Sequence, residues 1–133
     1  MDDLQIFNRP YSHTFRITQE QFDLFRQMSA DQNPLHTDPT FAQQHGFASN
    51  VVYGNVLGSC ISYFVGMLLP LKNVVIHQQQ IAYHKPVFVG DTLAFEAKVS
   101  NIFESVGVVE FKFTFRNQGN NMVAKGTVQI GLI

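Results

Sequence analysis

The sequence predicts an α+β domain in which an antiparallel sheet of about five strands lies against one long, buried helix. Three observations lead to this prediction. The chain has 133 residues, a length that suits a single domain. Residues 51–71 carry no formal charge, which is typical of a helix surrounded by protein. After residue 71 the side chains alternate between apolar and polar, as half-buried strands do.

The first expected elements are a short strand and an amphipathic helix. Residues 14–17 alternate between polar and apolar side chains, which indicates the strand. Thr18, with Gln21 three positions later, forms a capping-box pattern that starts the helix. The helix is expected to end near Ala30. Its predicted apolar face consists of Phe22, Phe25 and Met28.

A polar connection follows this helix. Pro34 pushes the residue before it out of the helical region, so we expect a loop here, carrying Asp31 and His36. Asp38 stands before another proline in the pattern of an N-cap, and Gly46 supplies a stop. These signals predict a two-turn helix between them.

The uncharged run predicts a helix from about Val52 to Leu69 that ends at Pro70. Its length alone would allow it to cross a bilayer. Against that alternative, the run contains polar side chains and three glycines, and no cluster of Lys or Arg flanks it. We therefore expect no membrane partner.

Four further strands are expected after the long helix. Two-residue alternation is clear over 92–99, 109–116 and 122–130, and residues 74–83 form a less regular strand. No repeat or linker divides the chain. Residues 1–133 are therefore expected to form one domain.

Composition limits the classes of partner. Nine basic and ten acidic residues give a formal net charge of −1, which lacks the positive field that nucleic-acid binding usually needs, so no nucleic-acid partner is expected. Cys60 is the only cysteine, which excludes an intrachain disulfide and suits a reducing compartment. We expect a cytoplasmic protein.

The densest polar cluster, residues 31–38, is the first candidate for chemistry. Asp31 and His36 are five positions apart across a proline-stiffened turn, so their side chains can converge on one water or hydroxyl for general acid-base catalysis. A structural interpretation also exists, in which Asp31 caps a turn, His36 fills a half-buried slot and Asp38 caps the next helix. The pattern favours capping for Asp38 and leaves both interpretations open for the other two.

The long helix carries a row of small residues at four-residue intervals: Gly54, Gly58, Ser62 and Gly66. This spacing returns to nearly the same face, which indicates close approach by the sheet or by the helix of another subunit. Gly54 has a second interpretation, since an amide in the first turn has no intrahelical acceptor. Such an amide can bind a carbonyl oxygen that becomes negative during a reaction.

Other chemistries find little support in the sequence. His45, His77 and His84 share no metal-ligand spacing with His36, so no metal site is expected. Cys60 lies within an apolar run and is expected to be a small core residue. Ser59 and Ser62 lack the strand-turn setting of a hydrolase nucleophile, and no glycine-rich phosphate loop occurs. We expect no cofactor.

Two segments resemble the signatures of a known family. The hydratase motif of the (R)-specific enoyl-CoA hydratases, or MaoC-like dehydratases, is similar to Asp31-x-Asn33-Pro34-x-His36-x-Asp38 followed by Phe41-Ala42, Gly46-Phe47 and Gly54. The second signature of that family is similar to residues 86–93, PVFVGDTL. The resemblance extends from about Phe15 to Ile130.

The resemblance implies a hot-dog fold, in which an antiparallel sheet wraps a long central helix. It implies a homodimer, and it leaves room for a higher oligomer. The implied reaction is reversible hydration of a trans-2-enoyl thioester of CoA or acyl carrier protein to the (R)-3-hydroxyacyl thioester. Asp31 and His36 would activate the water, and the amide of Gly54 would bind the thioester oxygen. Ser62 would support the site, and Asn33 would shape the loop.

Two positions depart from the family pattern. Tyr53 stands where family members usually carry His before the glycine, and Asn55 replaces a residue that is commonly apolar. Tyr53 is expected to alter the mouth of the site or the acyl pocket.

Two other functions stay open from the sequence. An acyl thioesterase of the same fold would need a carboxylate near the thioester carbon, typically on the long helix, and this helix has no Asp or Glu. A non-catalytic acyl-thioester-binding module would keep the scaffold without turnover. The intact Asp31, Asn33 and His36 argue against such a module.

Overall fold

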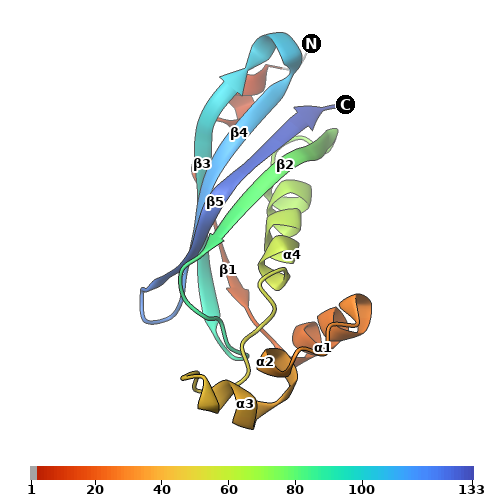
Figure 1. Ribbon diagram of the computed structural model, residues 1–133. Coiled ribbons are helices and arrows are strands. Elements are labelled where there is room, and N and C mark those ends of the chain that lie inside the picture. The colour runs from red at the N-terminus through yellow and green to blue at the C-terminus, as the bar shows by residue number, and fades with distance from the viewer. Residues whose placement is uncertain (1–2) are drawn as a thin grey trace.

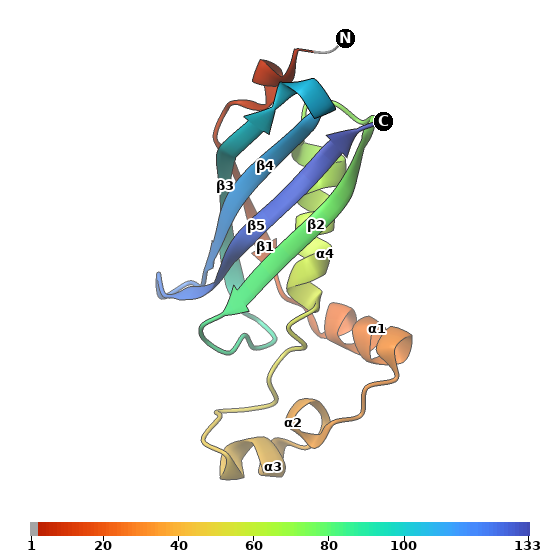
Figure 2. The ribbon, with the colours of Figure 1, turned by 45° about the horizontal axis from the view of Figure 1, so that its top comes forward.

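The computed structural model describes residues 3–133. Five antiparallel strands form one sheet in the order β1-β3-β4-β5-β2. Helix α4 (Val56–Tyr63) lies along one face of this sheet, and the helices α1 to α3 gather beyond the end of the sheet where α4 begins (Figures 1 and 2). The strands are β1 (Tyr11–Arg16), β2 (Val74–Tyr83), β3 (Thr92–Phe103), β4 (Val108–Arg116) and β5 (Met122–Leu132). The predicted α+β layer is confirmed.

Alternation along the strands builds the core, because every second residue faces α4. Phe64, at the end of α4, packs against Phe95 and Phe111 with ring centroids 5.1 and 5.2 Å apart. Burying each of these side chains contributes roughly 1.5–3 kcal/mol before conformational entropy is subtracted. The other fully buried phenylalanines are Phe7, Phe113 and Phe115. Aromatic packing thus fixes α4 against the sheet.

Helix α4 begins later than the sequence predicts, at Val56 instead of Val52, and continues as a π-helical segment (Phe64–Leu68) before Pro70. The predicted start was wrong because the residues before Val56 bond elsewhere. The N–H of Val52 donates to the carbonyl of Val87 at 2.8 Å, which holds this stretch in an extended form. Within residues 3–133, no helix combines the length and hydropathy needed to span a membrane.

Helix α1 (Gln19–Ser29) has the predicted capping box, in which Thr18 and Gln21 bond to each other's main-chain N–H groups. It ends at Ala30 in the left-handed conformation. The predicted apolar face is only partly correct, since Phe22 is buried but Met28 is 77% exposed. The last turn of α1 projects beyond the sheet, so the described part of the chain leaves most of Met28 uncovered (Figure 2).

The connection after α1 contains a one-turn helix, α2 (Pro34–Thr37), where the sequence predicted a loop. Asn33 keeps the extended conformation expected before a proline, and its side chain accepts a hydrogen bond from the N–H of Leu35 at 2.9 Å. Helix α3 (Pro39–Gln44) is the predicted short helix, capped by Asp38 and ended by the turn at Gly46. The capping role of Asp38 is confirmed.

Two glycines provide a test of the packing between elements. A methyl group on Gly126 of β5 would overlap the carbonyl oxygen of Gln80 and lie 2.9 Å from Phe113. We expect Gly126→Ala to lower the free energy of unfolding by about 1–3 kcal/mol, the cost of an overpacked core. Urea denaturation monitored by circular dichroism measures this loss.

Gly58→Ala is the matched control. Its methyl group would meet only the side chain of Gln79, at an ordinary distance of 3.7 Å. Alanine also favours a helix by up to about 1 kcal/mol relative to glycine, so this variant should be at least as stable as the parent. Equal stability of the two variants would contradict the close approach of β2 to β5 at Gly126.

Candidate active site

Asp31 directly follows the left-handed residue that ends α1, and hydrogen bonds hold most of its polar atoms. Its N–H donates to the Ser29 hydroxyl at 3.1 Å, and its Oδ1 accepts from the N–H of Asn33 at 3.0 Å. The second carboxylate oxygen, Oδ2, has no partner among residues 3–133. Asp31 is exposed, so this oxygen is available to a ligand.

His36 lies on the single turn of α2, and its imidazole orientation follows from one contact. Its Nδ1 lies 2.6 Å from the carbonyl oxygen of Val51. A carbonyl only accepts, so Nδ1 carries the hydrogen and the neutral ring keeps a lone pair on Nε2. Nε2 has no partner within the described chain, so it can take a proton.

The stretch before α4 is held between α2 and the loop that follows β2. The carbonyl of Leu35 accepts from the N–H of Val51 at 3.2 Å and from the side-chain amide of Asn50 at 3.1 Å. On the other side, Val52 donates to Val87 at 2.8 Å. These bonds bring the two motifs identified in the sequence together, although they lie about fifty residues apart.

Gly54 occupies the turn that leads into α4, two residues before the helix begins. Its carbonyl accepts from the N–H of Leu57 at 3.0 Å, but its own N–H has no acceptor in the part of the chain that the structure describes. The ring of Tyr83, at the end of β2, lies against it. A Cβ atom on residue 54 would lie 2.9 Å from Tyr83 Cζ. The glycine therefore allows close packing and leaves a free amide.

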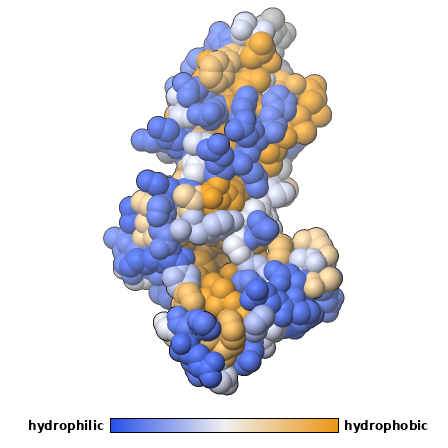
Figure 3. All heavy atoms as spheres, in the orientation of Figure 1, coloured by the Kyte–Doolittle hydropathy of each residue, from blue (hydrophilic) through white to orange (hydrophobic). Residues whose placement is uncertain are grey.

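A cavity of about 580 Å³ joins these groups. Four of the predicted site residues line it: Asp31, His36, Tyr53 and Gly54. Its apolar lining comes mainly from Phe25, Phe47, Val51, Val52, Leu57, Pro86 and Val87. Figure 3 shows apolar side chains surfacing along α4 and again among the helices α1 to α3, next to the hollowed waist of the molecule. A single chain thus lines this cavity with both polar groups and apolar side chains.

Two predicted residues do not line this cavity. Asn33 caps α2, which agrees with its expected role in shaping the loop. Ser62 is exposed on α4, eight residues or about two helical turns after Gly54. Tyr53 lines the cavity but is only 3% exposed, so it forms part of the floor and not of the mouth.

Tyr83 and His84, which no sequence pattern marks as site residues, line the cavity at the end of β2 together with Lys85, one of the basic residues that could meet a phosphate. The signal available was their position just before the second signature at Pro86. Their proximity to Gly54 depends on how β2 crosses α4, which no local pattern reveals. Burial raises the pKa of the Tyr83 hydroxyl, so this group stays protonated at neutral pH.

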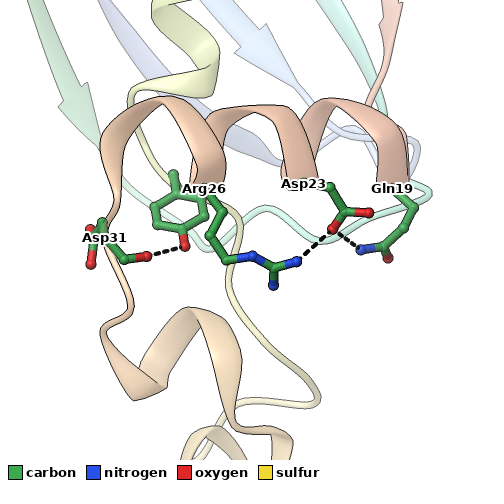
Figure 4. A network of polar contacts seen from close by, with 5 residues as sticks. Gln19, Asp23, Arg26 and Asp31 are labelled. Atoms are coloured by element: carbon green, nitrogen blue, oxygen red, sulfur yellow. Dashed lines mark hydrogen bonds and ion pairs between the residues drawn. The ribbon is translucent and has the colours of Figure 1, made fainter.

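Positive charge at the cavity comes from Lys85. Arg26 on α1 pairs with Asp23 at 3.1 Å, and Gln19 donates to the same carboxylate oxygen (Figure 4). Lys72 donates to the carbonyls of the π-helical segment, away from the cavity. Among residues 3–133, no group of three His, Cys, Asp or Glu side chains is placed to hold a metal ion.

Comparison with known proteins places the chain in a family. A family model described as a MaoC like domain matches residues 5–117. The chain belongs to the MaoC-like family. It is 32% identical to an (R)-specific enoyl-CoA hydratase from Aeromonas caviae over 81% of each chain. It is also 26% identical to a mitochondrial 3-hydroxyacyl-[acyl-carrier-protein] dehydratase from Arabidopsis thaliana, over 80% of this chain and 65% of that one.

Solved structures agree with this assignment. The MaoC-like chain superimposes on the (R)-hydratase of A. caviae with a TM-score of 0.86, 28% identity and 96% coverage of both chains. The unliganded R-hydratase from Pseudomonas aeruginosa gives a TM-score of 0.83 and 26% identity, over 94% of this chain and 80% of that one. The expected hot-dog fold is therefore confirmed.

Cys60 offers a test of which groups are reactive. The thiol is 5% exposed on α4, and burial raises its pKa to about 11 from the ordinary value of 9.0. At pH 8 its thiolate fraction should therefore be about 100-fold lower in the folded chain than in the unfolded chain. We expect iodoacetamide to alkylate the native protein at least 100-fold more slowly than the urea-unfolded protein.

Mass spectrometry of the alkylated chain over time measures both rates. Cys60→Ser is the control, since it removes the only thiol and should abolish labelling. Rapid labelling of the native protein would mean that Cys60 is accessible, and would reopen the possibility of a nucleophilic thiol.

Proposed function

We propose that this MaoC-like protein is a hydro-lyase that adds water reversibly to a trans-2-enoyl thioester and forms an (R)-3-hydroxyacyl thioester. One observation carries the proposal. Three groups without partners in the described chain, Asp31 Oδ2, His36 Nε2 and the N–H of Gly54, belong to residues that line one cavity. The hydratase and dehydratase names of the relatives agree with this chemistry.

In the proposed mechanism, Asp31 and His36 bind a water molecule between them. His36 Nε2 takes a proton as the water oxygen attacks C3 of the enoyl group, and the carboxylate of Asp31 orients the water. The pair then supplies a proton to C2. General acid-base pairs of this kind typically contribute 10²- to 10⁴-fold in rate.

The amide of Gly54 would bind the thioester oxygen. As water adds to C3, negative charge moves through the conjugated system onto that oxygen. A fixed N–H donor at this position stabilises the enolate more than the neutral ground state, because its dipole is already oriented. The apolar lining from Val52 and Leu57 would hold the acyl chain and exclude bulk water.

Lys85 is the cation placed to meet a phosphate group of the carrier, CoA or acyl carrier protein. It lines the cavity, and its ammonium lies 3.4 Å from the side chain of Asn121, a weak contact that a ligand could replace.

We also propose that the protein acts as a homodimer. β2 lies at one edge of the sheet, where its outer main-chain groups can pair with a second copy. The exposed side of α4, with Ser62 and Gly66, would then be covered by the partner subunit. The expectation of a cytoplasmic location stays a prediction.

A thioesterase is the second candidate of the same fold. It would need a carboxylate on α4, and residues 56–68 contain no Asp or Glu. Release of free thiol from an acyl-CoA, without loss of the double bond, would identify this activity. Binding without turnover would identify a non-catalytic module.

Hydration can be measured directly with crotonyl-CoA, since addition of water removes the absorbance of the conjugated enoyl thioester. We expect Asp31→Asn and His36→Ala each to lower kcat/KM by about 10²-fold or more, because each removes half of the acid-base pair. Circular dichroism should show both variants folded, since Asp31 is exposed and His36 is only half-buried.

Two matched variants control for charge and for loss of an imidazole. Asp38→Asn keeps a good N-cap on α3, and His45→Ala changes an exposed histidine at the end of that helix. Both should retain activity within about 2-fold. Full activity in Asp31→Asn and His36→Ala would remove the proposed site assignment.

The role of Gly54 can be tested through its neighbour. Gly54→Ala places a methyl group 2.9 Å from Tyr83 Cζ, which pushes the Tyr83 ring and the peptide that carries the free amide apart. We expect kcat/KM to fall by about 10- to 100-fold. The double variant Gly54→Ala with Tyr83→Ala should recover part of this loss, measured by the same absorbance assay. No loss in the single variant would contradict the proposed role of the amide.

A further inference from the structure

Tyr53 contacts both members of the proposed acid-base pair. Its hydroxyl donates to the main-chain carbonyl of Asp31 at 2.5 Å. Its ring stacks on the imidazole of His36, with centroids 4.0 Å apart and an interplanar angle of 26°. Tyr53, at the floor of the cavity, thus contacts the first and the last residue of segment 31–36.

Tyr53 is itself held from several sides. The rings of Phe22 and Phe25 on α1 lie 5.2 and 4.9 Å from its ring. Its carbonyl accepts from the N–H of Val56 at 3.0 Å, which starts α4. Because these contacts come from two helices, the side chain of Tyr53 is rigidly held. It can therefore fix the position of the polar segment 31–36 that it contacts.

The protonation state of Tyr53 suits a permanent donor. Burial and the nearby carboxylate of Asp31 raise the pKa of its hydroxyl above the ordinary value of 10.0. The hydroxyl therefore keeps its hydrogen at neutral pH. Figure 4 shows the carbonyl of Asp31 directed toward this hydroxyl, while its carboxylate extends to the other side. This tether, the hydrogen bond from the Tyr53 hydroxyl to the Asp31 carbonyl, therefore leaves Oδ2 of the carboxylate open to a ligand.

The stacking contact limits the motion of His36 in a different way. The hydrogen bond from Nδ1 to Val51 requires the imidazole to stay in one plane, and a flip about the Cβ–Cγ bond would break it. An aromatic ring at stacking distance resists tilting of that plane. Ring and hydrogen bond together keep Nε2 turned away from Val51.

We propose that Tyr53 is the positioning residue of the site. Its hydroxyl fixes the main chain of Asp31, and its ring holds the plane of the His36 imidazole, which keeps the hydrogen bond from Nδ1 to Val51, and with it the tautomer, in place. Neither contact reaches the substrate, so Tyr53 acts through the other two residues. The kinetic test rests on the proposed hydration, whereas the tautomer of His36 is measurable without any substrate.

The kinetic test uses Tyr53→Phe, which removes the hydroxyl and keeps the ring. Loss of the tether loosens Asp31 while the apolar lining of the cavity stays the same. We expect kcat for crotonyl-CoA to fall roughly 10-fold, with KM changed by less than about 2-fold.

Tyr11→Phe is the matched control. The Tyr11 hydroxyl also donates to a main-chain carbonyl, that of Phe7, at 2.9 Å, and the side chain is 7% exposed. It packs against Phe64 and Phe111 outside the cavity. A merely structural role predicts that both variants lose similar stability and keep kcat. A parent-like kcat in Tyr53→Phe, or an equal loss of kcat in Tyr11→Phe, would overturn the proposed role of the Tyr53 hydroxyl.

The second test reads the imidazole of His36 by ¹⁵N NMR in the free protein. We expect the Nδ1–H tautomer in the parent and in Tyr53→Phe, and a mixture of both tautomers in Tyr53→Leu, which removes the stacked ring. An unmixed Nδ1–H form in Tyr53→Leu, or a predominant Nε2–H form in the parent, would overturn the role of the ring.

The two readouts separate this inference from the proposed function. A parent protein that does not hydrate enoyl thioesters would refute the reaction, while the NMR comparison would still decide the role of the ring. Should Tyr53→Leu fail to fold, Tyr53→Phe still decides the role of the hydroxyl through kcat, and the tautomer of the parent still tests the expected orientation of His36.

Discussion

Hydrogen bonds between two stretches of chain, 31–38 and 50–54, are the constraint on which the site depends. Neither stretch belongs to the sheet. The carbonyl of Leu35 accepts two bonds from the second stretch, and the carbonyl of Val51 orients His36 in return. Such reciprocal bonds can hold an acid-base pair in place with no more regular structure than the single turn of α2.

The sheet contributes to the site indirectly, by fixing where α4 begins. Phe64 locks the far end of the helix onto Phe95 and Phe111, so its first turn cannot slide along the sheet. Gly54 lies in the turn that leads into this helix, and the end of β2 brings Tyr83 against it. The rigid core therefore determines the position of the amide, and the polar connections determine the position of the carboxylate and imidazole.

Much of the fold could be predicted because its signals are local. Strand alternation and the Thr18 capping box each depend on residues a few positions apart. The start of α4 was mispredicted because Val52 looks helical by hydropathy, and only its bond to Val87 reveals the extended form. Pro34 blocks a helix before itself but is well suited to begin one, so α2 was missed. The motif predicted Asp31 and His36, but the imidazole tautomer and the position of Tyr53 depend on contacts between distant segments.

The two ends of α4 differ in how their unpaired main-chain groups are satisfied. At the far, C-terminal end, in the π-helical segment, the ammonium of Lys72 donates hydrogen bonds to the carbonyls of Gly66 and Met67. At the near end, the N–H of Gly54 is left without a partner in the described chain. Two carbonyls at the far end are therefore bonded to a cation, whereas an N–H beside the near end is open to the cavity. Such a helix attracts electron-rich atoms to one of its ends.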